Sequence, residues 1–258
     1  MTVVRVLIAL PLGLVFGSFL TVVVHRVPAG ESIVRPRSRC PSCGAQLRAT
    51  DNVPVVWWLL PRGRCRSCGT RISVVYPLIE LATAGLFVGA ALRIDDPWLA
   101  ALLAPFSAVL LALAVIDWRT KKLPNRIVYP SVLVSAGYLL VARVAGAPVH
   151  LAGAGVGFLA YGGGMLIVAL IVPRGMGMGD VKLAGLIGLV LGALGVRFVG
   201  VAAAVGILIG GVAAVVALLF GATRKTGIPY GPSMALGAVV SVFAGSEIAD
   251  AYLQLLGA

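Results

Sequence analysis

Charged residues are scarce in this chain of 258 amino acids. They make up 12% of it, whereas soluble domains carry about 25%. Apolar residues account for 60% of the sequence. This balance excludes an ordinary soluble domain. It predicts an all-α polytopic membrane protein, in which nearly the whole chain is buried in lipid or in its own helical bundle.

Acidic residues are the scarcer kind of charge, nine against 21 lysines and arginines, so the formal net charge is +12. In a soluble protein such an excess suggests binding to nucleic acid. Here we expect no nucleic acid partner, because cytoplasmic loops of membrane proteins collect Lys and Arg. With the N-terminus outside, most basic residues fall in or beside the loops 25–75, 117–126, 173–180 and 221–230. The charge pattern therefore predicts that these four loops are cytoplasmic.

Long polar stretches are also rare, and eight apolar runs make up most of the chain. The runs are 6–24, 76–92, 98–116, 127–142, 151–172, 181–196, 198–220 and 231–255. Crossing ~30 Å of hydrocarbon takes roughly 20 residues of helix. About eight transmembrane helices are expected. Six or seven is the alternative count, since two runs are short and 181–196 could continue into 198–220 as one bent element. The first run lacks a following A-x-A site, so we interpret it as a span and not as a cleaved signal peptide.

Glycine, by contrast, is abundant, with 33 residues. Pairs four residues apart recur in the apolar runs, and this spacing lets membrane helices approach closely. The pairs are Gly153 and Gly157, Gly188 and Gly192, and Gly206 and Gly210. They predict close packing of helices in the bundle.

Only four cysteines are present, and all lie in the first expected cytoplasmic loop. They form two C-x-x-C-G motifs, "RCPSCG" with Cys40 and Cys43 and "RCRSCG" with Cys65 and Cys68. Four thiolates in this pattern predict a closed, zinc-ribbon-like site in which Zn²⁺ is structural. Two disulfides are the alternative, but they require an oxidising compartment. The expected organisation is a first transmembrane helix (1–24), a four-cysteine zinc-binding loop (25–75) and a transmembrane catalytic bundle (76–258).

Two aspartates stand at the expected cytoplasmic boundary, Asp117 in "AVIDWRTKK" and Asp180 in "GMGMGDVK". Ionisable residues at a span are costly and indicate function, although helix capping is the alternative for each. Two carboxyl groups that meet in a partly dry site share one proton, so they offer an acid and a base together, as in aspartic proteolysis. Gly177, Met178 and Gly179 are then the expected substrate-binding stretch, because backbone without a Cβ lets an extended peptide approach closely.

Two other classes of protein fit parts of the pattern. A proton-coupled transporter could use Asp117 and Asp180 as a relay, but the chain lacks the internal repeat that many transporters show. A zinc-bearing membrane scaffold explains the cysteines and leaves both aspartates without a role. Glu80 is interpreted as structural or secondary, and His25 as a headgroup contact. For Lys182, pairing with Asp180 and contact with headgroups are both left open.

These motifs, in this order, closely resemble those of the type IV prepilin peptidases, membrane aspartic proteases with a GxGD motif. The similar stretches are "FGSFLTVVVHRVP" at 16–28, the two cysteine motifs followed by "YPLIE", "IDWRTKKLPN", "GMGMGDVKL" and "IPYGPSMALGA" at 228–238. The resemblance implies that Asp117 and Asp180 are the catalytic pair. It also implies an enzyme that removes the leader from prepilins or pseudopilins at the cytoplasmic face of the bacterial inner membrane.

The resemblance has further implications for partners and cofactors. The substrates are expected to carry a hydrophobic N-terminal helix held in the bilayer. Many members of the family also N-methylate the new amino terminus with S-adenosylmethionine, and the four-cysteine loop accompanies this two-activity form. Thr21 is a departure, since the family commonly has asparagine after "GSFL". The basic loops are expected to contact anionic headgroups of membrane lipid.

Overall fold

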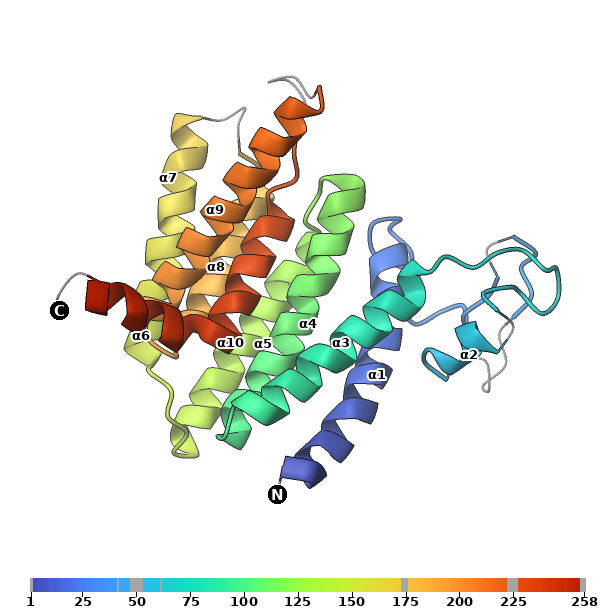
Figure 1. Cartoon of the computed structure of the whole chain (residues 1–258), viewed down its shortest axis with the longest axis horizontal. Helices are drawn as coiled ribbons and strands as arrows, with labels where there is room; N and C mark the ends of the chain where they lie inside the picture. Colours follow the sequence, from blue (N-terminus) through green and yellow to red (C-terminus); the bar gives the residue numbers. More distant parts are fainter. Residues whose placement is uncertain are drawn as a thin grey trace. The chain divides into compact units, whose positions relative to one another are not determined.

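The computed structural model describes residues 2–40, 42–46, 53–60, 62–172, 176–221 and 227–255. Four basic residues of the expected cytoplasmic loops, Arg48, Arg174, Arg224 and Lys225, lie outside these ranges. Within the described ranges the chain forms helices joined by loops, with two isolated β-bridges (Figure 1). The all-α fold predicted from the composition is therefore confirmed.

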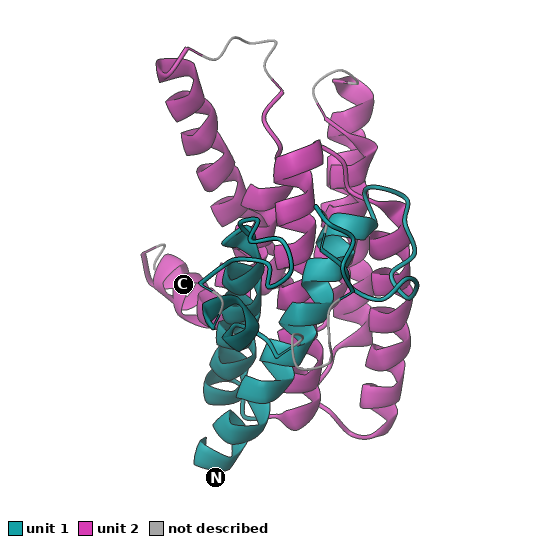
Figure 2. Cartoon of the chain, turned by 90° about the vertical axis from the view of Figure 1, so that its right-hand side faces the viewer, with its two compact units in different colours: residues 1–95 teal, residues 96–258 magenta. Residues whose placement is uncertain are grey.

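The chain divides into two compact units, residues 1–95 and residues 96–258 (Figure 2). In the first unit, α1 (Thr2–Arg26) packs closely on α3 (Val75–Arg93). The loop between them carries the short helix α2 (Val56–Leu59) and the four cysteines. Gly17 of α1 permits the close approach, because a Cβ there would lie 2.8 Å from the Cα of Glu80 on α3.

The second unit is a bundle built around α8. Its elements are α4 (Pro97–Thr120), α5 (Asn125–Val144), α6 (Leu151–Gly157), the π-helix η2 (Phe158–Gly163), α7 (Gly164–Ile171), α8 (Met178–Gly192), α9 (Val196–Leu219) and α10 (Gly231–Leu255). Helix α8 contacts α5, α6, η2, α7, α9 and α10. Several of its large side chains, including Leu183, Leu186 and Ile187, are fully buried. The first residues of α8 are therefore held in place from several sides.

Seven helices in the described part of the chain are long and apolar enough to cross a membrane. They are α1, α3, α4, α5, the continuous α6–η2–α7 segment, α9 and α10. The remaining expected span corresponds to α8, which has only 15 residues. At 1.5 Å per residue it rises about 22 Å, less than the ~30 Å of hydrocarbon. The alternative of one bent element over 181–220 is wrong, because Gly195, with φ 138°, separates α8 from α9.

The glycine pairs predicted from spacing lie where two helices touch. A Cβ added to Gly157 of α6 would overlap the carbonyl oxygen of Gly188 on α8 and lie 3.0 Å from the Cα of Gly192. Gly188 and Gly192 meet Gly157 and Gly153 in return. Two glycine ridges thus bring the backbones of α6 and α8 into direct contact, and this contact fixes the position of α8.

We expect Gly157→Ala to lower the stability of the bundle by roughly 1–3 kcal/mol, because a methyl group has no space between the two backbones. Gly155→Ala is the matched control, since a Cβ at Gly155, in the same helix, meets no atom within 4 Å. Thermal unfolding of both variants in detergent measures the difference. Equal midpoints would contradict the direct backbone contact.

Candidate functional site

Asp117 lies in the last turn of α4, and the residue is only 5% exposed. Its Oδ2 accepts a hydrogen bond of 3.0 Å from the backbone N–H of Gly231, the first residue of α10. The first amides of a helix lack partners within the helix, and they favour a negative charge. A Cβ at Gly231 would lie 2.6 Å from Oδ2, so the contact requires glycine. The carboxyl group of Asp117 therefore binds the N-terminus of α10. It does not cap α5, the helix that follows it in the sequence.

Asp180 is the third residue of α8, which follows the N-cap residue Gly177. The backbone of Gly177 is extended, with φ −79° and ψ 143°, and its carbonyl accepts from the N–H of Asp180 at 3.0 Å. The Asp180 carboxyl group in turn interacts with the backbone of Gly177. This reciprocal arrangement resembles a capping box, and it holds the carboxyl group at the start of α8.

The fold brings the two predicted aspartates together. Their carboxyl groups lie close enough for their charges to interact. Two phenol groups, those of Tyr161 and Tyr230, also interact electrostatically with Asp180. Four ionisable side chains from α4, α8, η2 and the turn before α10 thus form one cluster, which we call the aspartate cluster.

Tyr161 is, with Tyr230, one of the two members of this cluster that the sequence analysis missed. It lies in η2 and is 9% exposed, and its hydroxyl group has no hydrogen-bond partner among the described residues. A buried phenol usually finds a partner, and single π-helical turns occur frequently at functional sites. One signal could have identified it, since Tyr161 is the only residue with a polar side chain in the run 151–172.

The expected substrate-binding stretch has two different environments. Met178 is 53% exposed, and a Cβ at Gly177 would meet only atoms of Asp180 and Gly179. A Cβ at Gly179 would instead lie 3.0 Å from the side chain of Leu123, in the turn after α4. Packing therefore explains the glycine at 179, because it lets the start of α8 approach the segment that follows Asp117.

Among the described residues, Lys182 interacts with two side chains of α5 and does not serve as the counter-charge of Asp180. Its Nζ donates to Oδ1 of Asn125 at 3.0 Å and lies 5.1 Å from the ring centroid of Tyr129. The interaction with Tyr129 is a cation–π contact. Lys182 thus fastens the first turn of α8 to the first turns of α5.

The four cysteines form the second site, in the first unit. All four thiols are free, and their sulfur atoms lie within 4.8 Å of one another. Cys40 and Cys68 bring their Sγ atoms to 3.9 Å. In a tetrahedral site with metal–sulfur bonds of about 2.3 Å, the sulfur atoms are about 3.8 Å apart. The cluster could therefore hold a metal ion after a small contraction.

The two cysteine motifs fold alike. Cys40 N–H donates to the Ala45 carbonyl and Cys65 N–H to the Thr70 carbonyl, both at 2.9 Å. Gly44 and Gly69, each with φ 71°, close the turns. Hydrogen bonding with the hydroxyl group and the amide of Thr70 lowers the pKa of the Cys68 thiol to about 6. The amide of Ala45 lowers the pKa of the Cys43 thiol, but hydrogen bonds with Cys68 and the other cysteines raise it to about 11. Binding of a metal ion would therefore release protons from the cluster.

Comparison with known proteins relates both units to one family. Residues 12–94 match the bacterial Peptidase A24 N-terminal domain, and residues 104–249 match the type IV leader peptidase family. The chain is 34% identical to the prepilin leader peptidase/N-methyltransferase of Stutzerimonas stutzeri, over 96% of this chain and 94% of that protein. The protein of the same name from Bacillus subtilis is 33% identical, over 94% and 96%. No solved structure matches the chain.

A relative with a different name has a related role. The type 4 prepilin-like proteins leader peptide-processing enzyme of Escherichia coli is 32% identical, over 90% of this chain and 91% of its own length. These matches give no support to the interpretation of Asp117 and Asp180 as the proton relay of a transporter.

We expect the purified full-length protein to contain about one equivalent of metal per chain, because four thiolates complete a tetrahedral site. Cys65→Ser should remove most of that metal, whereas Ser38→Ala, which changes the same loop outside the cluster, should not. Elemental analysis by mass spectrometry measures the content. Equal metal content in Cys65→Ser and the parent protein would exclude the cluster as the binding site.

Proposed function

Because the chain belongs to the type IV leader peptidase family, we propose that it removes the leader peptide from prepilins with Asp117 and Asp180 as its catalytic residues. The protein is a multi-pass membrane protease. Its relatives are named prepilin leader peptidase/N-methyltransferase, a name that combines both activities in one enzyme. One observation above all supports the assignment of the residues. The buried Asp117 carboxyl group faces the N-terminus of α10 and interacts with the charge of Asp180.

The chemistry follows from the proximity of two carboxyl groups. Two carboxyl groups whose charges interact do not both ionise easily, so we propose that the pair shares one proton in the reacting enzyme. The ionised group takes a proton from water as the water oxygen attacks the scissile carbonyl carbon. The protonated group donates to the carbonyl oxygen, and the pair then returns a proton to the leaving amine. No covalent bond to the enzyme forms.

Asp117 is the better candidate for the group that stays ionised. The N–H of Gly231 already donates to its Oδ2, and the first turn of α10 favours negative charge there. Asp180 has an interaction with the Gly177 backbone and lies beside two phenols. We therefore assign proton donation to Asp180 and water activation to Asp117.

The substrate reaches this pair along the start of α8. The exposed Met178 and the open Gly177 lie next to Asp180, so an extended peptide can lie along them. We propose a substrate whose hydrophobic N-terminal helix stays in the bilayer while the leader emerges beside the aspartate cluster. Anchoring in the membrane orients the scissile bond and raises its effective concentration at the site.

Tyr161 is proposed as a positioning residue in the same reaction. Its buried O–H has no acceptor among the described residues and lies within electrostatic range of Asp180. A donor at this place can hold the attacking water or the polarised carbonyl oxygen. The π-helical turn of η2 supports this role, since it changes the direction in which the residue projects.

We propose that the cysteine cluster binds Zn²⁺, which four thiolates favour. Four protein ligands leave no open position for a substrate, so the ion is structural and holds the two cysteine motifs together. We place this loop in the cytoplasm, because basic residues gather there and free thiols persist in a reducing compartment. The same reasoning places the protein in a bacterial inner membrane, with its basic loops against anionic lipid headgroups. For the methylation we propose S-adenosylmethionine as the methyl donor.

We expect Asp117→Asn and Asp180→Asn each to lower prepilin cleavage by at least about 10³-fold, because neither proton transfer can proceed without its carboxyl group. Asp250→Asn is the matched control, since Asp250 forms only an exposed ion pair with Arg197. Cleavage is read from the size of a co-purified prepilin in detergent. Retention of cleavage by either of the first two variants would rule out the pair as the catalytic residues.

We expect Tyr161→Phe to lower kcat by roughly 10²-fold with little change in KM, because the hydroxyl group acts on the reacting atoms and not on substrate binding. Tyr138→Phe is the structural control, since it removes a hydrogen bond to the Trp98 carbonyl away from the cluster. The kinetics of leader removal separate the two constants. A loss of stability without a loss of kcat would show that Tyr161 is only a packing residue.

A further inference from the structure

Two helices, α5 and α10, pack on both of the helices that carry the aspartates. Asp117 belongs to α4 and Asp180 to α8, and each of these helices contacts α5 and α10. The contact with α10 includes the hydrogen bond from Gly231 to Asp117. The contact with α5 is made by side chains that have no part in the reaction as proposed above. These side chains connect the two halves of the aspartate cluster by a second route.

The turn between α4 and α5 is short and begins close to the first aspartate. Lys121 N–H donates to the Asp117 carbonyl at 2.8 Å, and the left-handed backbone of Lys121, with φ 53°, ends α4. Residues 121–124 alone separate α4 from Asn125, the first residue of α5. Pro124 stands directly before Asn125, and a proline ring fixes φ. The end of α4 and the start of α5 are therefore rigidly connected.

This segment contacts α8 on both sides of Asp180. Before the aspartate, a Cβ at Gly179 would lie 3.0 Å from the Cβ of Leu123, so the backbone of α8 lies directly against that side chain. After the aspartate, Lys182 donates from Nζ to Oδ1 of Asn125 at 3.0 Å. Asp180 thus stands between two contacts with the segment that follows Asp117.

The ammonium group of Lys182 also lies 5.1 Å from the ring centroid of Tyr129. Asn125 and Tyr129 are four residues apart in α5, so they present the amide and the ring on the same side of the helix. A hydrogen bond from a charged donor is stronger than one between neutral groups, and the cation–π contact adds to it. The long stem of lysine suits this position, because it reaches from one helix to the next.

We propose that Lys182 is a positioning residue, which acts through Asn125 to hold Asp180 at the distance from Asp117 that the shared proton requires. The inference rests on the proposed function, because it assigns a role in that reaction. The two carboxyl groups act on one water and one carbonyl oxygen only over hydrogen-bond distances. A displacement of about 1 Å in an active site can lower the rate by on the order of 10²-fold. Loss of the hydrogen bond to Asn125 would allow such a displacement of the first turn of α8.

Direct binding of the substrate is the alternative role for Lys182, and kinetics distinguish the two. A cation that binds an anionic group of the substrate changes KM, and it does so whether or not Asn125 is present. A positioning residue changes kcat, and its replacement has no further effect once Asn125 is replaced. Variants of Lys182 and Asn125, made singly and together, therefore separate these roles.

The rate of prepilin cleavage by the full-length protein in nanodiscs tests the proposal. We expect Lys182→Met and Asn125→Leu each to lower kcat about tenfold and to change KM less than about twofold, because Asp180 is displaced while the substrate contacts remain. The double variant should lose no more than the larger of the two single losses, since either change already breaks the hydrogen bond. Lys182→Arg and Asn125→Asp should keep most of the activity, because each retains a donor or an acceptor for the same bond.

Lys122→Met is the matched control. Lys122 is an exposed residue of the α4–α5 turn, so its replacement removes the same charge and leaves the hydrogen bond between Lys182 and Asn125 in place. We expect its kcat to equal that of the parent protein. An equal loss of kcat in Lys122→Met and Lys182→Met would show that the net charge matters and not the hydrogen bond, and it would overturn the proposal.

Three further outcomes would contradict the positioning role. A raised KM with normal kcat in Lys182→Met, absent from Asn125→Leu, would identify Lys182 as a substrate contact. Additive losses in the double variant would show that the two residues act separately. A lower midpoint of thermal unfolding with unchanged kcat would show that the hydrogen bond only stabilises the fold.

The failure of this inference can be told apart from the failure of the proposed function. If cleavage requires both Asp117 and Asp180 while Lys182→Met and Asn125→Leu cleave as the parent protein does, this inference alone is wrong. If Asp117→Asn or Asp180→Asn retains cleavage, the proposed catalytic pair is wrong, and the positioning role is wrong with it.

Discussion

The hydrogen bond from Gly231 to Asp117 is the constraint on which the catalytic unit depends. A carboxylate that is 5% exposed needs compensation, and the first amide of α10 supplies it. The position of α10 is in turn set by α9. A Cβ at Gly237 would lie 2.6 Å from the backbone nitrogen of Gly206, so the two helices touch along glycines. The close packing of α9 and α10 thus determines where the amide stands, and with it the orientation of the carboxyl group at the end of α4.

The other half of the site depends on a helix that is too short for the bilayer. Helix α8 is buried and rises about 22 Å, so at least one of its ends lies within the hydrocarbon thickness. Polar backbone at that depth is tolerated only where protein or a water-filled space surrounds it. The extended Gly177 and the partly buried Asp180 occupy such an end. The shortness of α8 therefore provides what a hydrolase in a membrane needs, a place where water and a peptide meet a carboxyl group.

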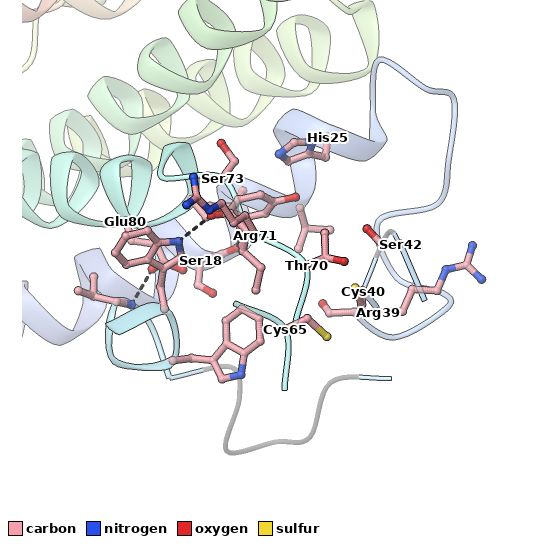
Figure 3. Close-up of a pocket in the computed structure, with 18 of the residues that line it drawn as sticks. Ser18, His25, Arg39, Cys40, Ser42, Cys65, Thr70, Arg71, Ser73 and Glu80 are labelled. Carbon is pink, nitrogen blue, oxygen red and sulfur yellow. Dashed lines mark hydrogen bonds between the residues drawn. The ribbon is translucent and has the colours of Figure 1, made fainter. Parts of the chain in front are cut away.

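Much of this arrangement was predictable from the sequence, because its signals are local. Four cysteines in two short motifs and two aspartates at the ends of apolar runs stand out against a chain with few polar residues. Tyr161 and Tyr230 were not recognised as neighbours of Asp180, since their proximity depends on how η2 and α10 pack, which no spacing encodes. Glu80 was interpreted as structural or secondary, and its hydrogen bond from Val55 N–H and its place in a cavity wall depend on packing that no spacing encodes (Figure 3). The glycine at 179 was explained by substrate approach, whereas its contact with Leu123 shows a packing reason.

The cysteine loop contains little that could fold it without its thiols. Its large apolar residues, such as Ile33, Val34 and Leu60, are exposed, while Cys40 and Cys65 are buried. A metal ion that joined its two motifs would stabilise such a segment. Because such an ion would bind the folded loop and not the unfolded one, its removal would lower the stability of the first unit, while the aspartate pair lies in the other unit.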